Sequence, residues 1–211
     1  MPRAWFDHRC IDKNHVWAQG DSNGGMFTFD LAVDSRTAHR FAGIGPGIGL
    51  PHYGYNQGLA VTGAGAGRMS LIGVWGKQDT TVPPVPVPHD GSGGHPERTM
   101  DTDYSGWYYQ SYTSTLAKWA EDNGCDAASA AAVPATEAWG IDAASDLECT
   151  RYSGCPVGVD VVGCLHSGGH NTGAEGRAVM LEFMSQHRKA DANACTGSAC
   201  SAKRGLRRIW G

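Results

Sequence analysis

Residues 20–24, Gly-Asp-Ser-Asn-Gly, constrain the fold of this chain more than any other segment. They follow a short apolar run at residues 16–19 and precede a helical pattern at residues 25–33. A Gly-x-Ser-x-Gly sequence between a strand and a helix is typical of a strained turn that exposes the serine hydroxyl. Side chains in place of Gly20 and Gly24 are expected to collide with neighbouring backbone in such a turn. The sequence therefore predicts a strand-to-helix turn that carries an exposed serine.

Short apolar runs alternate with helical patterns along the chain. The apolar runs, each bounded by turn residues, lie at residues 16–18, 41–44, 70–75 and 159–165. The helical patterns lie at residues 25–33, 108–122 and 174–188. Strands that alternate with helices predict an α/β fold, a mostly parallel sheet with helices packed on its faces. Residues 127–134 are nearly all Ala and Ser, which leaves a short helix and a surface loop as alternatives.

Composition argues against two classes of partner. The formal net charge of the 211 residues is −4, so the chain lacks the basic surplus typical of nucleic-acid-binding proteins. No apolar run approaches the roughly 18 residues of a membrane-spanning helix. We therefore expect neither a nucleic-acid partner nor a membrane partner. The 30 glycines and 10 prolines indicate many tight turns rather than a helical bundle.

Cysteine usage indicates an oxidising compartment. Seven cysteines are many for a protein of a reducing compartment, and the odd number leaves at least one thiol unpaired. We therefore expect a secreted protein. Residues 1–7 lack the apolar segment of a signal peptide, so the export signal is expected to lie outside this sequence. We expect Cys195 and Cys200 to pair with each other and Cys10 to be the free thiol.

A nucleophilic serine needs a base and an orienting acid, and candidates for both follow it along the chain. Asp79 comes just after the apolar run at residues 70–75, which puts it at the carboxyl edge of a parallel sheet, where sites form. His170 follows the last apolar run and two glycines, and His166 is a rival for the same role. If Asp79 points away from the serine, the alternative acids in the following loop are Asp90, Asp101 and Asp103.

The order serine, acid, histidine predicts an ester hydrolase that works through an acyl-enzyme. Ser22 is the predicted nucleophile, His170 the general base and Asp79 the acid that orients the imidazole. The backbone N–H of Asn23, directly after the serine, is the predicted oxyanion donor. Such a reaction needs no cofactor.

A metal site is the weaker alternative. Cys164, His166 and His170 are residue types that bind metals. Their spacing matches no recognisable zinc motif, so we expect no metal.

Four segments of the chain resemble the feruloyl esterase and polyhydroxybutyrate depolymerase group of secreted α/β-hydrolases. Residues 10–26 resemble the elbow of that family, residues 75–83 its acid-bearing loop, residues 119–125 its helix end and residues 168–170 its histidine loop. The similarity runs from about residue 10 to residue 188. It implies an α/β-hydrolase-like catalytic domain over residues 1–188, followed by a polar C-terminal tail at residues 189–211.

The resemblance implies the same roles for Ser22, Asp79 and His170. It also implies a disulfide between Cys125 and Cys155. The implied substrates are carboxylic esters: feruloyl or acetyl esters on plant polysaccharide, a polyester, or short soluble esters. A relative that has lost catalysis and binds a carbohydrate or a polymer is the alternative function.

The sequence departs from the family at its beginning. Family members have several strands and an oxyanion-hole loop before the elbow, whereas only residues 1–21 precede Ser22 here. We therefore expect an N-terminally truncated fold with one oxyanion donor missing, a loss worth about 3–4 kcal/mol of transition-state stabilisation. The elbow strand is then an exposed sheet edge. We expect a homo-oligomer through that edge, cover by Trp5 and Phe6 of the N-terminal segment, or a protein of low stability.

Overall fold

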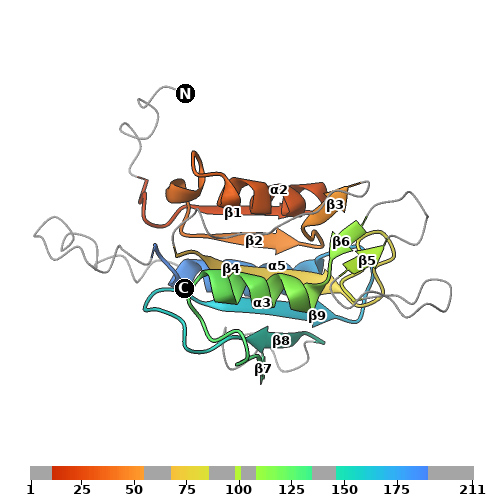
Figure 1. Cartoon of the computed structure of the whole chain (residues 1–211). Helices are drawn as coiled ribbons and strands as arrows, with labels where there is room; N and C mark the ends of the chain where they lie inside the picture. Colours follow the sequence, from red (N-terminus) through yellow and green to blue (C-terminus); the bar gives the residue numbers. More distant parts are fainter. Residues whose placement is uncertain (1–10, 55–67, 86–97, 101–107, 135–145, 190–211) are drawn as a thin grey trace, which may run out of the picture.

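The computed structural model describes residues 11–54, 68–85, 98–100, 108–134 and 146–189, and its strands form two sheets (Figure 1). In this part of the chain the larger sheet has six strands in the order β1-β2-β4-β9-β8-β7. They are β1 (Trp17–Asp21), β2 (Gly43–Gly47), β4 (Ser70–Gly76), β7 (Ala131–Pro134), β8 (Glu148–Arg151) and β9 (Val161–His166). The smaller sheet, in the order β3-β6-β5, contains β3 (His52–Gly54), β5 (Arg98–Met100) and β6 (Tyr108–Gln110). The helical elements are α2 (Asn23–Val33), η1 (Ala38–Arg40), α3 (Tyr112–Asp122) and α5 (Gly173–Gln186).

Four neighbouring strands, β1, β2, β4 and β9, run parallel. The pairing between β4 and β9 is continuous from Leu71 opposite Val161 to Gly76 opposite His166. The carboxyl ends of these strands therefore meet at one edge of the sheet, where sites on parallel sheets form. The predicted α/β class is confirmed. The sheet is mixed, because β8 pairs antiparallel with β9 and β7 pairs antiparallel with β8.

Side chains of the central strand β4 alternate between two hydrophobic cores. Leu71 and Trp75 belong to the core that α2 and α3 cover, whereas Ile72 and Val74 belong to the core under α5. This alternation is the two-residue period of a β-strand. Helices α2 and α3 thus lie on one face of the sheet and α5 on the other (Figure 1). No helix in the described ranges is long and apolar enough to cross a membrane.

Helix α3 packs closely on β9. The hydroxyl of Tyr112 donates to the Gly163 carbonyl at 2.8 Å, and burial raises the pKa of Tyr112 to about 12. A Cβ atom at Gly163 would lie 2.5 Å from Leu116 Cδ1, so the absence of a side chain there permits this close approach.

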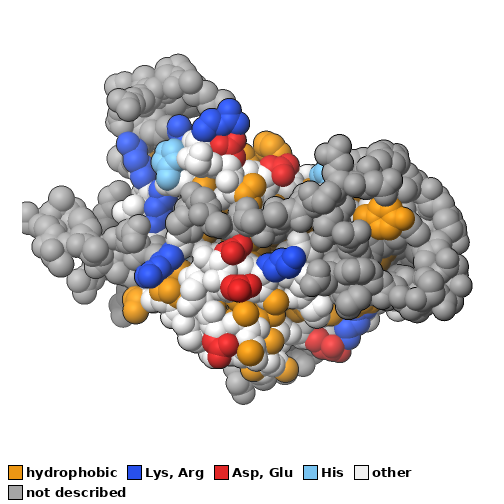
Figure 2. Space-filling model, viewed as in Figure 1, with side chains coloured by type: hydrophobic (Ala, Val, Ile, Leu, Met, Phe, Trp, Pro, Cys, Tyr) orange, Lys and Arg blue, Asp and Glu red, His pale blue; other side chains and the backbone are white. Residues whose placement is uncertain are grey.

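Figure 2 shows acidic and basic side chains interspersed on the face that carries α2 and α3.

Two segments fold differently from the sequence-based expectation. Residues 131–134 form the edge strand β7, not a short helix or a surface loop. Four residues of Ala, Ala, Val and Pro carry no clear strand pattern, and pairing with β8 decides their conformation. The helix predicted from residue 108 begins at Tyr112, because Ser111 caps it by accepting a hydrogen bond from the Ser114 amide. The expected start was wrong, since residues 108–110 form β6.

Two disulfides join cysteines within the described residues. Cys125, just after α3, pairs with Cys155, as the family resemblance implies. Cys149 in β8 pairs with Cys164 in β9, directly across the two strands, a bond that the sequence analysis does not assign. Both bonds are compatible with an extracellular protein. The remaining cysteines lie outside the described residues: Cys10, Cys195 and Cys200.

The turn between β1 and α2 requires glycine at two positions, of which only one was expected. A Cβ atom at Gly20 would lie 2.6 Å from the carbonyl carbon of Gly24. A Cβ atom at Gly25 would lie 2.7 Å from the carbonyl oxygen of Gly47. At Gly24 itself a Cβ atom would meet no described heavy atom within 4 Å outside its own helix, so the expected collision there is wrong. Gly24 lies on the exposed side of α2, and the steric constraint belongs to Gly25 instead.

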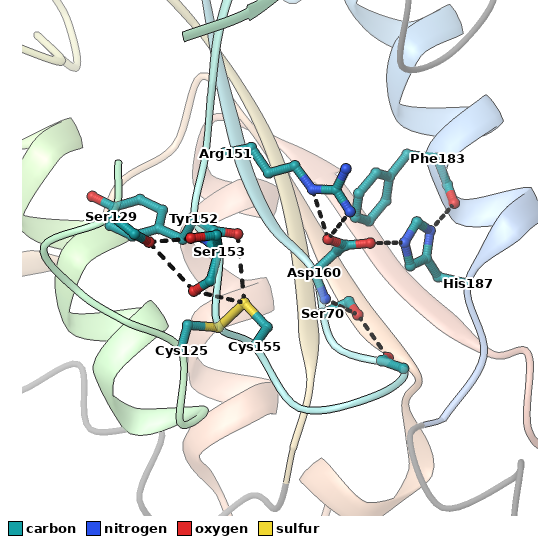
Figure 3. Close-up of polar contacts among 11 residues, drawn as sticks. Ser70, Cys125, Ser129, Arg151, Tyr152, Ser153, Cys155, Asp160, Phe183 and His187 are labelled. Carbon is teal, nitrogen blue, oxygen red and sulfur yellow. Dashed lines mark hydrogen bonds and ion pairs between the residues drawn. A yellow bond between two sulfur atoms is a disulfide. The ribbon is translucent and has the colours of Figure 1, made fainter. Parts of the chain in front are cut away.

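An ion-paired cluster lies where β9 begins, at the sheet edge opposite to the carboxyl ends (Figure 3). Asp160 accepts hydrogen bonds from Arg151 Nε at 2.8 Å and from His187 Nε2 at 2.6 Å. His187 follows α5, and its Nδ1 donates to the Phe183 carbonyl at 2.7 Å. Burial raises the pKa of Asp160, but the hydrogen bonds and charges of His187 and Arg151 outweigh burial and hold that pKa below its usual value. The cluster therefore anchors the carboxyl end of α5 to the sheet.

Strand β1 is an end strand of the larger sheet among the described residues, with β2 as its hydrogen-bonded neighbour. Pairing of its other edge with a second copy of the chain stays a prediction. Trp5 and Phe6, the alternative cover for that edge, lie outside the described residues, as does the C-terminal tail from residue 190.

We expect Gly20→Ala to lower the free energy of unfolding by about 1–3 kcal/mol, because the new methyl group meets backbone of the turn itself. Gly24→Ala is the matched control, since its methyl group has space and alanine favours a helix more than glycine does. Its free energy of unfolding should differ from that of the wild type by less than about 1 kcal/mol. Urea unfolding measures both variants. Equal destabilisation by the two substitutions would contradict the steric account.

Asp160→Asn should lower the free energy of unfolding by about 1–2 kcal/mol at pH 7, because Arg151 and His187 lose a charged acceptor. The pKa of Asp160 is lower in the folded chain than the usual value of about 3.9. Its stabilisation is therefore present above about pH 4 and is lost as the pH falls through the folded pKa. Urea unfolding at several pH values, with the exposed Asp30→Asn as control, tests this. A difference that grows in acid would show the reasoning wrong.

Candidate active site

Three loops at the carboxyl edge of the parallel strands bring together Ser22, Asp79 and His170. Ser22 directly follows β1, Asp79 follows β4, and His170 lies between β9 and α5. His170 Nε2 lies 2.9 Å from Ser22 Oγ, and His170 Nδ1 lies 2.7 Å from Asp79 Oδ2. The parallel register thus joins side chains that are 148 and 91 residues apart in sequence into one hydrogen-bonded chain.

The backbone of Ser22 adopts a left-handed conformation, with φ 55° and ψ −120°. Such a conformation in a residue with a side chain costs about 1–3 kcal/mol and persists only where its surroundings enforce it. Here the Ser22 amide donates to the Gly47 carbonyl at 2.9 Å, and the Ser22 carbonyl accepts from the Met26 amide at 2.9 Å. The turn from β1 into α2 therefore satisfies both backbone groups of Ser22 while its hydroxyl reaches His170.

The carboxylate of Asp79 is held by backbone amides on one oxygen and by the histidine on the other. Its Oδ1 accepts hydrogen bonds from the Thr81 amide at 2.8 Å and the Val82 amide at 2.9 Å, which leaves Oδ2 for His170. An ionised carboxylate only accepts, so the proton of the imidazole lies on Nδ1. The Nε2 atom of His170 is then the acceptor for the hydroxyl of Ser22. One carboxylate thus fixes both the tautomer and the orientation of the ring.

Solvent access differs sharply along this chain of hydrogen bonds. The side chain of Asp79 is fully buried, that of His170 is 29% exposed, and Ser22 is half-buried. Ser22 and the imidazole are therefore partly open to solvent, whereas the carboxylate is shielded from water.

The rival histidine has a different environment. His166 is buried at the end of β9, and its Nδ1 accepts a hydrogen bond from the Gly168 amide at 3.0 Å. Its ring therefore stabilises, through this hydrogen bond, the loop that carries His170. The alternative acids named from the sequence lie outside the described residues: Asp90, Asp101 and Asp103.

Asn23 is the first residue of α2 and is exposed. Amides in the first turn of a helix have no acceptor within the helix. They also lie at the positive end of the helix dipole, which favours a negative charge nearby. The Asn23 N–H therefore has the properties expected of an oxyanion donor.

Three residues beside this site were not predicted from the sequence, and their side chains contact one another. Asp21 precedes the serine, and its carboxylate accepts hydrogen bonds from Thr172 and Arg177 in the segment after His170. No periodicity or short motif signals a contact between residues 151 positions apart. Only the fold brings them together.

The residues considered as metal ligands have other partners. Cys164 is bonded to Cys149, and His170 lies between Ser22 and Asp79. Within the described residues, no group of three or more His, Cys, Asp and Glu side chains is arranged to hold a metal ion.

A hydroxyl that donates to an imidazole, itself oriented by a buried carboxylate, is an arrangement that activates serine as a nucleophile. No protein-family model matches the chain, and no curated protein matches its sequence.

Proposed function

We propose that this protein is a serine esterase of the α/β-hydrolase type, which hydrolyses carboxylic esters through an acyl-enzyme. The observation that carries the proposal is the chain of short hydrogen bonds from Ser22 Oγ through His170 to Asp79. The left-handed backbone of Ser22 between a strand and a helix supports it, because that conformation exposes the hydroxyl. The order serine, aspartate, histidine along the chain also supports the α/β-hydrolase assignment.

Acylation begins when Ser22 Oγ attacks the carbonyl carbon of the ester. The hydroxyl proton passes to His170 Nε2, and the carbonyl oxygen becomes an oxyanion that accepts a hydrogen bond from the Asn23 N–H. Collapse of the tetrahedral intermediate breaks the bond to the leaving oxygen, which takes the proton from His170 Nε2. The alcohol leaves, and the acyl group stays on Ser22.

Deacylation uses the same groups with water as the nucleophile. His170 Nε2 removes a proton from water, and the oxygen of that water attacks the acyl carbon. The second tetrahedral intermediate then collapses, releases the carboxylic acid and returns the proton to Ser22 Oγ. In both half-reactions Asp79 stabilises the imidazolium that forms, without itself taking a proton.

Ser22→Ala and His170→Ala should each lower kcat for p-nitrophenyl acetate by a factor of about 10⁴ or more, because each breaks the same nucleophile–base unit. The double variant should be about as slow as either single variant, since the second change removes nothing that still functions. Initial-rate kinetics measure this. Ser185→Ala, which changes an exposed serine of α5, is the matched control and should keep the wild-type rate. Equal rates for wild type and Ser22→Ala would overturn the proposal and leave polymer or carbohydrate binding to be tested.

Activated short-chain esters should be the best substrates among the carboxylic esters. A p-nitrophenyl leaving group demands less oxyanion stabilisation than an unactivated alcohol, and among the described residues the oxyanion donor that we propose is the Asn23 N–H alone. The value of kcat/KM should therefore be higher for p-nitrophenyl acetate and butyrate than for methyl ferulate or a solid polyester. Higher kcat/KM for the feruloyl ester would contradict this ranking and point to a second donor.

A further inference from the structure

A second set of contacts joins the serine turn to the histidine loop. Thr172 Oγ1 donates to Asp21 Oδ1 at 2.8 Å, and Arg177 Nη2 donates to Asp21 Oδ2 at 3.0 Å. Asp21 is adjacent to Ser22, and Thr172 lies two residues after His170. The segments that carry the nucleophile and the base are therefore fastened to each other through one carboxylate.

The hydroxyl of Thr172 bonds to Asp21 and not to its own helix. Thr172 is the N-cap residue of α5, a position where a threonine side chain ordinarily accepts a hydrogen bond from an amide of the first turn. The side chain of Thr172 accepts no such hydrogen bond from the first turn of α5. Thr172 is only 1% exposed. The hydroxyl of Thr172 thus does not stabilise the start of its own helix. It stabilises the packing of that helix against the end of β1.

The end of β2 has room for this contact only because residue 47 is glycine. A Cβ atom at Gly47 would lie 2.2 Å from Asp21 Oδ1 and 2.6 Å from Thr172 Oγ1. The carbonyl of Gly47 also accepts the hydrogen bond from the Ser22 amide. Gly47 thus lies against the serine turn and also against the hydrogen-bonded side chains of Asp21 and Thr172.

We propose that Asp21, Thr172 and Arg177 form a latch that sets the distance and angle between Ser22 and His170. They are positioning residues, and the inference rests on the proposed esterase function of the same site. Thr172 contributes most, because its hydrogen bond is short and the threonine that donates it is buried. The side chain of Arg177 is 58% exposed, so solvent weakens its ion pair with Asp21.

Loss of the latch should lower kcat with little change in KM, because it alters the alignment of the reacting groups and leaves the substrate contacts intact. A misplacement of about 1 Å at a reacting centre lowers a rate about 100-fold. Thr172→Val keeps the volume of the side chain and removes the hydroxyl. We expect this variant to lose about 10- to 100-fold in kcat for p-nitrophenyl acetate and in the rate at which a fluorophosphonate labels Ser22.

Companion variants separate positioning from folding. Thr172→Ser restores the hydroxyl and should recover kcat to within about three-fold of the wild type, whereas Arg177→Met should lose less than about five-fold. Thr115→Val is the matched control, because Thr115 is also a fully buried threonine and its hydroxyl has no hydrogen-bond partner among the described residues. It should keep the wild-type kcat. Thermal unfolding reports whether each variant is folded.

A double-variant cycle gives the decisive outcome. Asp21→Ala removes the other half of the latch, so Asp21→Ala with Thr172→Val should be no slower than the slower single variant. Rate losses that multiply, or wild-type kcat in folded Thr172→Val, would overturn the latch and leave the esterase proposal standing. If Thr172→Val does not fold, a cycle of Asp21→Ala with Arg177→Met gives the same comparison, and that double variant should be no slower than Asp21→Ala alone. A wild-type protein that neither hydrolyses the ester nor is labelled would overturn the esterase function, and the latch with it.

Discussion

The proposed active site depends on a strained backbone that its neighbours hold in place. Ser22 and Ile48 are the non-glycine residues with positive φ in the described part of the chain. The two residues lie close together, where β1 and β2 end. The carbonyl of Gly47, just before Ile48, accepts the hydrogen bond from the Ser22 amide. Ile48 is fixed in turn by donating its own amide to the Val74 carbonyl at 2.8 Å. Strain concentrated where two neighbouring strands end is typical of a functional site.

Helix α5 connects the base of the proposed triad to the rest of the sheet. At its amino end, Thr172 and Arg177 bind the carboxylate that ends β1, and beyond its carboxyl end His187 binds Asp160 before β9. Between these points Phe183 packs edge-to-face on Trp17 of β1, with ring centroids 5.8 Å apart. The loop that carries His170 is therefore attached to a helix held along its whole length, which suits a base that must stay aligned with a serine on another strand.

The sequence predicts those parts of the molecule whose signals are local. The parallel strands are short apolar runs between turn residues, and Ser22, Asp79 and His170 each follow such a run, so the edge at which they meet could be inferred. Strand β7 could not be predicted, because Ala-rich residues take their conformation from the partner strand. The contact of Asp21 with Thr172 and the disulfide between Cys149 and Cys164 were missed for a related reason. Both depend on which strands become neighbours, and nothing in a short window of sequence records that.

The two disulfides interleave along the chain, since Cys149 lies inside the loop closed by Cys125 and Cys155, and Cys164 lies outside it. Cys149 and Cys164 are buried, whereas Cys125 and Cys155 are half-buried at the surface. A dissolved thiol should therefore reach the Cys125–Cys155 bond first and remove the covalent link between the end of α3 and the loop before β9, while the strands β8 and β9 stay covalently joined. Reducing conditions should act on this molecule in two stages. The first loosens a surface loop remote from the hydroxyl of Ser22, and the second requires the sheet itself to open.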